Sequence, residues 1–394
     1  MSTYWSKKEE GKLRRLWSKA TKEEISKVFS DRSWCAIKSK ANLLGLKRLV
    51  FPKDLNADTA KWKEATRFYK DRWLKSEKED TRTEIILDRM KKVVSILPPI
   101  PVRTTKPMKK KYDTEEVVLQ VSDHQIGQHT TREETGFPPY NIKIYKQRLN
   151  FLRDTFLTIT DIHRRAMNIR KLHIFSCGDI VDNEIIFKQQ PFEIETDVLE
   201  QFFLGVDCLS SFLLELAPYF DEIKTYWVSG NHGRIGMPGE HKWKVNWDYL
   251  LARFVAEKIK NQKNIEMVIP KRWWKIANVM GWNFLIAHGE DIRRYLRFPY
   301  YDTENFYKDW QLLARTLGKR FEYLCIGHFH VPAEMDMSSI GEYIINGAFT
   351  GTNWMALKRM RAVARPTQRM WFVHPRIGIT SRYKIRLDMA KKMK

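Results

Sequence analysis

The amino-acid sequence predicts an α/β domain preceded by a small all-α unit. Short apolar runs rich in β-forming residues recur between positions 117 and 326, and each lies beside a cluster of polar residues. Buried strands of open α/β sheets carry functional residues at their ends in this way. Residues 140–165, after a Pro-Pro pair, have a helical pattern that suits an α/β sandwich. The five clusters are Asp123-His124-Gln125, Gly178-Asp179-Ile180-Val181-Asp182, Gly230-Asn231-His232, Ala287-His288-Gly289 and Gly327-His328-Phe329-His330.

The composition is that of a folded protein with a large core. Of its 394 residues, 43% are apolar, which is enough for more than one domain. No apolar run reaches membrane-spanning length, and Met1 to Lys12 lacks the apolar segment of a secretory signal. We therefore expect a cytoplasmic protein without a membrane partner. The four cysteines form no C-x-x-C pair, so reduced thiols are expected instead of a disulfide scaffold.

Basic charge is concentrated at both ends of the chain. Residues 1–112 hold 30 Lys and Arg against 14 Asp and Glu, and residues 358–394 hold 12 against 1. Residues 113–357, which contain all five clusters, hold 28 against 32. This partition favours contact of the basic ends with a polyanion, while part of the central acidic charge would bind metal. A solvated surface with a basic tail would give the same composition.

The first 48 residues predict three short helices. Ser6-x-x-Glu9 and Thr21-x-x-Glu24 are capping-box patterns that open the first two helices. A third helix is expected to begin near Ser33 and to end at Gly45, because glycine favours the left-handed conformation that follows many helices. The outward face of this third helix is basic and polar.

This N-terminal stretch resembles the Myb/SANT-like helix-turn-helix of phage and mobile-element proteins. The resemblance rests on Trp5-Ser6-x-x-Glu9-Glu10, Arg32-Ser33-x-x-Ala36-Ile37 and Leu44-Gly45-Leu46-Lys47-Arg48. It implies that the third helix enters the major groove of DNA. A net charge of +8 over residues 1–48 agrees with DNA binding, whereas docking of another protein is the alternative. The residues assigned to DNA are Arg32, Ser33, Lys38, Lys40, Lys47 and Arg48.

The residue types in the five clusters suit two metal ions bound side by side. Carboxylate and amide oxygens bind hard ions such as Mn²⁺, and imidazole binds borderline metals. Two ions about 3.5–4 Å apart can activate a bridging hydroxide and neutralise the attacking and departing oxygens of a phosphoester. A single cluster would mean little, but five in this order behind strand-like runs indicate one site.

The ordered series of clusters resembles the calcineurin-like metallophosphoesterase superfamily over about residues 115–385. The pattern of that superfamily is D-x-H, G-D-x-x-D, G-N-H-[DE], H and G-H-x-H. The resemblance implies a four-layer β-sandwich flanked by helices, with two divalent ions as cofactors. Mn²⁺ is the expected ion, with Mg²⁺, Fe or Zn²⁺ as alternatives. The implied ligands are Asp123, Gln125, Asp179 and His330 for the first metal, and Asp179, Asn231, His288 and His328 for the second.

His232 is not a metal ligand in that superfamily. The resemblance implies that it stabilises the transition state or protonates the leaving oxygen, a role that imidazole performs near neutral pH. Asp182 is expected to support the site by hydrogen bonding, and Glu290 could orient a ligand in the same way. His241, Trp243 and Trp247 follow the catalytic loop and could line the cleft.

The first departure from the superfamily pattern is Gln125, which stands in the place of a histidine. His124 lies one position earlier, and neighbouring side chains of a strand point to opposite faces, so His124 is not expected to replace that histidine. Gln125 could bind metal through its amide oxygen, which would give a weaker site that prefers Mn²⁺ or Mg²⁺. The alternative is a first site that is partly occupied or lost.

The second departure is Gly233, which replaces the acidic residue after Asn-His. The acidic residue of the superfamily orients the catalytic histidine, so His232 needs another partner here. Arg234 follows, and we predict that it grips a phosphate bidentately, although a surface role is equally compatible with its position.

The sequence predicts four consecutive segments, and the second of them contains a linker. Pro98, Pro99, Pro101 and Pro107 break any helix, and a semi-extended linker would hold a DNA-bound module close to the catalytic domain. The segments are the helix-turn-helix module at 1–48, a charged helix with a Pro- and Lys-rich linker at 49–112, the catalytic domain at 113–388 and a basic tail at 389–394.

These observations predict a metal-dependent phosphodiesterase that hydrolyses DNA. The protein would be of phage or mobile-element type, with a catalytic fold related to double-strand-break repair nucleases, and would work in the host cytoplasm. Its expected partner is DNA, and the oligomeric state is left open, with a dimer possible by analogy. The alternatives are a phosphomonoesterase acting on protein or nucleotide, and a DNA-binding or assembly protein whose metal centre is degenerate at Gln125 and Gly233.

Overall fold

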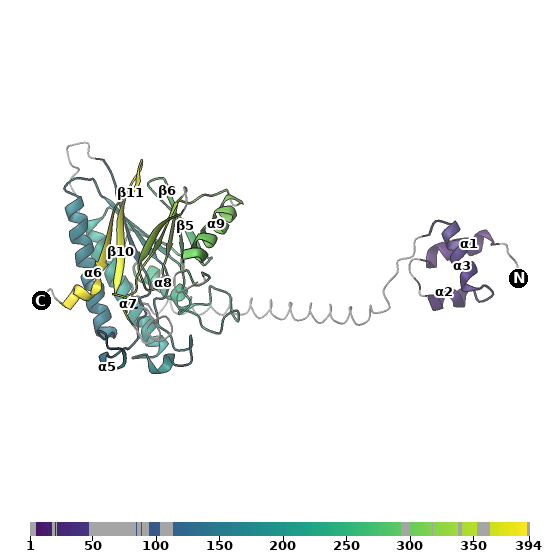
Figure 1. The fold of residues 1–394 in the computed structure, drawn as a ribbon, viewed down its shortest axis with the longest axis horizontal. Helices are drawn as coiled ribbons and strands as arrows, with labels where there is room; N and C mark the ends of the chain where they lie inside the picture. The colour runs from purple at the N-terminus through teal and green to yellow at the C-terminus, as the bar shows by residue number, and fades with distance from the viewer. Residues whose placement is uncertain are drawn as a thin grey trace. The chain divides into compact units, whose positions relative to one another are not determined.

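The computed structural model describes residues 5–17, 20, 22–46, 84, 88, 94–102, 113–292, 300–316, 318–337, 341–352 and 363–391. Contacts between residues divide the chain into two compact units, Met1–Lys75 and Ser76–Lys394. Both units are drawn in Figure 1.

The N-terminal unit contains the three predicted helices. They are α1 (Lys7–Leu16), α2 (Lys22–Val28) and α3 (Trp34–Leu43). The capping box at Ser6 and Glu9 is formed, Ser33 caps α3, and Gly45 adopts a positive φ of 67°. Thr21, the start of the second capping pattern, lies outside the described residues. One small core holds the helices together and consists of Leu13, Trp17, Ile25, Phe29, Ile37 and Ala41.

Two mixed β-sheets form the centre of the second unit (Figure 1). Their strands are β1 (Glu116–Val121), β2 (Lys171–Ser176), β3 (Glu222–Trp227), β4 (Ile265–Val268), β5 (Trp274–Val279), β6 (Trp282–Ala287), β7 (Tyr323–Ile326), β8 (Ala333–Met337), β9 (Gly341–Ile345), β10 (Thr367–His374) and β11 (Gly378–Arg386). One sheet has the order β11-β10-β1-β2-β3-β4, and the other has the order β5-β6-β7-β9-β8. Strands β1 to β4 are parallel, as are β6, β7 and β9.

Helices cover the outer face of each sheet, so the unit has four layers. The helices are α5 (Arg132–Thr135), α6 (Ile142–His163), α7 (Val198–Leu216), α8 (Trp247–Lys258) and α9 (Tyr300–Thr316), with 3-10 turns at Gln190–Phe192, Ala217–Tyr219 and Leu387–Lys391. Val117 and Leu119 of β1 pack with residues of α6, α7 and α8. Val118, on the opposite face of β1, packs with β5 and β6 between the sheets. Tyr307 and Trp310 of α9 cover the second sheet.

The predicted α/β sandwich is therefore confirmed, together with one of its helices. The helical pattern over residues 140–165 corresponds to α6. The expected basic tail at 389–394 begins inside a 3-10 turn, and residues 392–394 lie outside the described part.

Helix α7 is the most apolar helix of the described chain. With its 3-10 extension, Val198–Tyr219, it is long and apolar enough to cross a membrane by length and composition, and the mean hydropathy of its most apolar stretch is 1.3. Phe202, Val206 and Leu209 lie in the core beneath the first sheet. Burial in the sandwich accounts for this apolar composition.

The described end of the predicted linker lies against the second unit. Val94, Leu97 and Ile100 pack on its hydrophobic core. The backbone of Ile100 is paired with the side chain of Gln262, which accepts from the amide at 2.8 Å and donates to the carbonyl at 3.2 Å. Residues 94–102 therefore form a strap on this unit. Most of the predicted charged helix at 54–95 lies outside the described residues.

Candidate metal centre

The five polar clusters meet because the strands before them end at a common edge of the sandwich. Strands β1, β2 and β3 are parallel neighbours in one sheet, and β6 and β7 are parallel neighbours in the other. Parallel strands present their carboxyl ends on the same side. The clusters thus converge from positions more than two hundred residues apart in the sequence.

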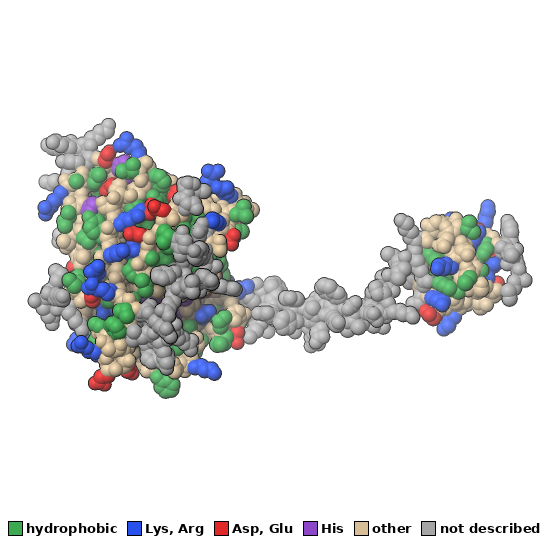
Figure 2. Space-filling model, viewed as in Figure 1, with side chains coloured by type: hydrophobic (Ala, Val, Ile, Leu, Met, Phe, Trp, Pro, Cys, Tyr) green, Lys and Arg blue, Asp and Glu red, His purple; other side chains and the backbone are tan. Residues whose placement is uncertain are grey.

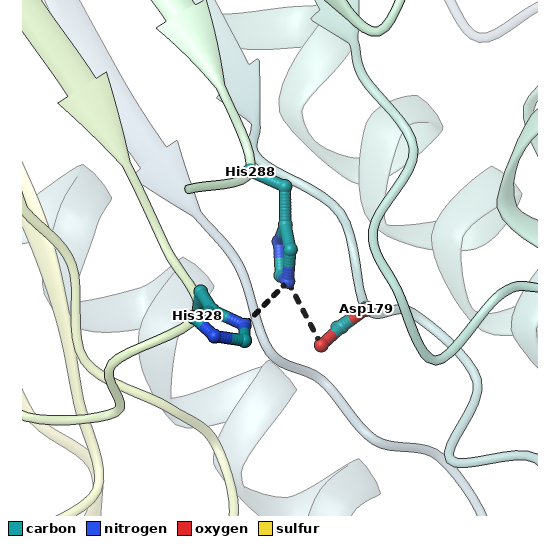
Figure 3. Close-up of side chains that lie close together, drawn as sticks. All are labelled: Asp179, His288 and His328. Atoms are coloured by element: carbon teal, nitrogen blue, oxygen red, sulfur yellow. Dashed lines mark hydrogen bonds and ion pairs between the residues drawn. The ribbon is translucent and has the colours of Figure 1, made fainter. Parts of the chain in front are cut away.

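The residues assigned to the second metal lie within contact distance of one another (Figure 3). The Nε2 atom of His288 is 3.0 Å from Oδ2 of Asp179 and 3.0 Å from Oδ1 of Asn231. The Nδ1 atom of His328 is 2.9 Å from the same Asn231 oxygen and 3.3 Å from Nε2 of His288. Ligand atoms of Asp179, His288 and His328 all lie within 4.8 Å of one another, as a metal site requires.

The atoms of these residues that face inward carry lone pairs, and such a set of atoms suits a cation. Nδ1 of His288 lies 2.6 Å from the carbonyl oxygen of Cys177, so the neutral ring donates there and turns the lone pair of Nε2 inward. The inward groups of Asp179 and Asn231 are also acceptors. Although burial opposes it, the charge of Asp179 raises the pKa of His288 to about 10. A divalent ion satisfies the same acceptors, and these residues therefore fit a metal.

The residues assigned to the first metal also converge. The Nε2 atom of His330 is 3.4 Å from Oδ1 of Asp123 and 3.3 Å from the amide nitrogen of Gln125. The amide oxygen of Gln125 is buried without a hydrogen-bond partner. A 180° rotation of the Gln125 side-chain amide exchanges its oxygen and nitrogen atoms. The oxygen, which is an acceptor, then lies beside Nε2 of His330. Gln125 can therefore supply an oxygen ligand in the position of the superfamily histidine.

Most of the proposed ligands have a strained backbone. Among the described residues, seven that are not glycine have a positive φ, and five of these seven are proposed ligands. Such conformations cost about 1–3 kcal/mol each and persist only where the surrounding structure enforces them. The strain marks the strand ends as a functional site. The five residues are Asp123, Gln125, Asp179, His328 and His330.

His124 points away from the metal centre, as the sequence predicts. Its ring stacks on Phe349 with centroids 4.4 Å apart, and Nδ1 lies 3.2 Å from the hydroxyl of Tyr145. Burial lowers the pKa of His124 to about 3. This histidine is a neutral core residue and does not substitute for Gln125.

His232 has the partner that Gly233 cannot provide. Its Nδ1 atom is 2.8 Å from the carbonyl oxygen of Asp182 and 3.4 Å from the carboxylate of the same residue. Burial lowers the pKa of His232, but the charges of Asp179 and Asp182 outweigh it and raise the pKa to about 9. Gln128 and Gln190 donate to the Asp182 carboxylate and hold it in place. Asp182 thus supports His232 by hydrogen bonding, in accord with its predicted role.

Gly233 is required by close packing. A Cβ atom at this position would lie 2.1 Å from Oδ1 of Asn246. Asn246 caps α8 and donates to the carbonyl of Gly230 at 2.9 Å. The space that an acidic residue would use is therefore occupied by a structural contact between α8 and the catalytic loop.

Asp248 holds together the loops that carry Asp179 and Asn231, a role that was not predicted from the sequence. Its buried carboxylate accepts from the backbone amides of Asp179, Ile180 and Gly230 at 2.8, 3.0 and 2.9 Å. These amides belong to the loops that carry Asp179 and Asn231. The nearest sequence signal is the Asn-x-Asp that precedes an apolar helix, which reads as an ordinary helix cap.

Two other predicted roles are changed by the structure. The backbone carbonyl of Cys177 orients His288, and no hydrogen bond between Glu290 and His288 is found among the described contacts. Glu290 instead lines a cleft beside the site together with Arg234, His241 and Trp243. Trp247 does not line this cleft, because its ring packs against Phe202 with centroids 5.7 Å apart.

The residues assigned to DNA have mixed surroundings. Arg32 is paired with Glu9 at 3.0 Å and lies over the ring of Trp5, Lys40 is paired with Glu10 at 2.7 Å, and Ser33 caps α3. Lys38 is exposed. Lys47 and Arg48 lie outside the described residues. Lys and Arg side chains occupy several separate places on the visible face of this unit (Figure 2).

Residues 117–348 match the family model described as calcineurin-like phosphoesterase. The match covers more than half of the chain, so the chain belongs to this family. Its fold is a metallophosphoesterase sandwich with a group of His and Asp residues suited to metal. No curated protein matches the chain significantly.

Solved structures with this fold are distant in sequence. Vacuolar protein sorting 29 from Cryptosporidium parvum is 12% identical with a TM-score of 0.32, over 70% of this chain and 100% of that one. A predicted phosphoesterase from Streptococcus pneumoniae TIGR4 is 9% identical with a TM-score of 0.28, over 69% and 98%. A metallophosphoesterase from Sphaerobacter thermophilus is 13% identical with a TM-score of 0.26, over 68% and 88%. Similarity at this level carries no argument about substrate.

Proposed function

We propose that this protein is a two-metal phosphodiesterase that hydrolyses DNA and that its N-terminal unit recruits the substrate. The observation that carries the proposal is the convergence of two ligand groups beside the buried pair of His232 and Asp182. Two divalent ions, with Mn²⁺ as the expected species, would supply Lewis acidity and neutralise phosphate charge. The family supports a metal-dependent phosphoesterase; the diester substrate, DNA, Mn²⁺ and recruitment by the N-terminal unit are the parts that we propose.

The protein's own side chains have distinct roles in this proposal. His232, held through Nδ1 by Asp182, presents Nε2 toward Gln125 and the metal centre, where it can donate a proton to the leaving oxygen. Arg234 lies two residues later and faces the adjacent cleft, where a guanidinium can bind phosphate oxygens. Positioning of the phosphoester by these groups accounts for hydrolysis without a covalent intermediate.

The charge distribution supports DNA as the substrate. One basic segment, residues 1–112, precedes the catalytic domain, and the other, residues 358–394, includes its last two strands. Backbone phosphates are bound by such charge. Because Arg32 and Lys40 are paired with glutamates, Lys38 and the basic residues after α3 are the stronger candidates for phosphate contact. A phage or mobile-element origin, action in the host cytoplasm and a dimeric state belong to the same proposal.

The test is hydrolysis of labelled single-stranded and double-stranded DNA by the purified protein with Mn²⁺. A parallel assay offers a phosphomonoester, and the control is His232→Ala. We expect cleavage of DNA that is reduced at least about a hundredfold in the control, because general acid catalysis contributes that much. Turnover of the monoester with intact DNA would contradict the nuclease proposal. Inertness toward every phosphoester would favour a DNA-binding protein with a degenerate centre.

A further inference from the structure

A cleft of about 310 Å³ lies beside the metal centre. Ser229 and Gly230, which directly precede the metal ligand Asn231, form part of its wall. Arg234 and the loop up to Asn246 form another part. A part of the substrate bound in this cleft therefore lies next to the phosphoester at the metal centre. Because of this position, contacts in the cleft can select the substrate.

The loop that forms the cleft is fixed at both ends. The side-chain amide of Asn183 donates to the carbonyls of His232 and Arg234, at 2.6 Å each. At the other end, the amide of Trp247 donates to the carbonyl of Gly233 at 2.6 Å. A wall held in this way loses little conformational entropy when a ligand binds.

The side chains of the cleft combine three kinds of chemistry. Trp243 and Trp273 contribute partly exposed indole rings. Trp273 is held against Trp310 with ring centroids 5.0 Å apart, and Trp243 is held against Tyr249 at 5.7 Å. The cations are Arg234 and Lys242, and the carboxylates are Glu290 and Asp291.

We propose that this cleft binds a nucleotide, namely the one that flanks the scissile phosphate. The inference rests on the proposed phosphodiesterase function and specifies its substrate. A nucleotide combines an anionic phosphate for the cations, a flat base for the indoles and base N–H donors for the carboxylates. A ligand made of phosphate alone would use only the cations. A DNA strand and a free mononucleotide both contain a nucleoside phosphate, so either could supply the ligand.

The test compares two diesters with the same leaving group. One is the p-nitrophenyl ester of a deoxynucleoside 5′-monophosphate, and the other is methyl p-nitrophenyl phosphate, which has neither a base nor a second aromatic ring. We expect Trp243→Ala to lower the ratio of kcat/KM for the nucleotide ester over the base-free diester by about tenfold, because it removes one stacking surface. Trp243→Phe keeps an aromatic ring and should restore most of the ratio.

The matched control is Phe192→Ala. Phe192 is 86% exposed and lies outside the cleft, so its removal should leave the ratio unchanged. If both diesters are hydrolysed and Trp243→Ala does not change the ratio, the nucleotide cleft is wrong while the phosphodiesterase proposal stands. Hydrolysis of neither diester would contradict the phosphodiesterase proposal instead.

A binding measurement tests the cleft independently of hydrolysis. In the His232→Ala protein, deoxyguanosine monophosphate and a short single-stranded oligonucleotide should each quench tryptophan fluorescence, and Trp243→Phe should reduce that quenching. Tighter binding of the oligonucleotide would identify a DNA strand as the source, and tighter binding of the monophosphate a free nucleotide. Quenching by a phosphopeptide but by neither nucleotide would overturn the inference.

Discussion

Asp248 shows how a residue without contact to substrate can determine the geometry of the metal centre. One buried carboxylate accepts three backbone hydrogen bonds from the loops of Asp179 and Asn231. Hydrogen bonds to a charged acceptor are stronger than those to a neutral one, and an unsatisfied buried donor is costly. The distance between Asp179 and Asn231, two of the proposed metal ligands, thus depends on Asp248, which holds both of their loops in place.

Replacement of this carboxylate tests that dependence. Asp248→Asn places an N–H group among three N–H donors, so we expect a loss of stability of about 2–3 kcal/mol. Because the loops then move apart, metal affinity should fall about 10–100-fold. Thermal unfolding and isothermal titration with Mn²⁺ measure the two effects. Asp309→Asn, at an exposed position of α9, is the control and should change neither; equal metal affinity in Asp248→Asn would refute the role.

Gln125 should make the two metal sites unequal. An amide oxygen is a weaker ligand than imidazole for borderline metals, whereas the second site keeps all its expected ligands. We therefore expect one tight and one weak Zn²⁺ in the native protein, and two tight Zn²⁺ ions in Gln125→His. Titration calorimetry with elemental analysis gives the stoichiometry. Two equally tight ions in the native protein would contradict this prediction.

At the scale of elements, residues 94–102, which were predicted to be part of a linker, form a strap that packs on the second unit. Proline-rich composition predicts an extended segment, and the segment is extended enough to pair its backbone with Gln262. Its apolar residues Leu97 and Ile100 cover the core of the second unit. Residues 94–102, which precede the first strand, therefore belong to the second unit.

The pairing of Gln262 with Ile100 can be removed by a single substitution. Gln262→Ala eliminates three partly buried hydrogen bonds, two to Ile100 and one to Asn264, and should destabilise the second unit by about 1–2 kcal/mol. We also expect faster proteolytic cleavage near residues 94–102, because the strap opens more often. Gln262→Glu keeps the acceptor for the Ile100 amide and should have a smaller effect. Unchanged cleavage in Gln262→Ala would show that apolar packing and the hydrogen bond from the Leu97 amide to the Lys258 carbonyl hold the strap without Gln262.

At the scale of the whole molecule, two compact units divide the proposed work. The N-terminal unit has its own core of six buried residues, and the second unit contains all the candidate metal ligands. A separate recruiting unit raises the local concentration of a polymer without taking part in the chemistry. Hydrolysis and affinity for DNA should therefore respond separately to truncation.

Deletion of residues 1–48 tests this division. We expect DNA affinity to fall and its dependence on salt to flatten, because fewer counterions are released. Hydrolysis of a small diester should change less than twofold, since the catalytic residues lie in the other unit. Fluorescence anisotropy at several salt concentrations and a colorimetric assay measure the two quantities. Equal DNA affinity with and without the deletion would exclude recruitment by this unit.

The sequence by itself determined the fold class and the set of candidate ligands. Apolar runs of strand length and the polar clusters beside them depend only on neighbouring residues, so β1, β2, β3, β6 and β7 could be predicted locally. The resemblance to a family then fixed the order of the ligands. The departures at Gln125 and Gly233 were also visible in the sequence, which indicated that His232 needs another partner but not which atoms would contact it.

The tertiary structure decided which residues support the site. Asp182 beside His232, Asn246 against Gly233 and Asp248 between two loops are contacts across many positions of the chain. No local pattern encodes them, because they arise when helix α8 packs against loops that follow separate strands. The same packing creates the cleft of Trp243 and Trp273. Local periodicity specifies strands and helices, whereas their packing specifies which polar atoms share a buried space.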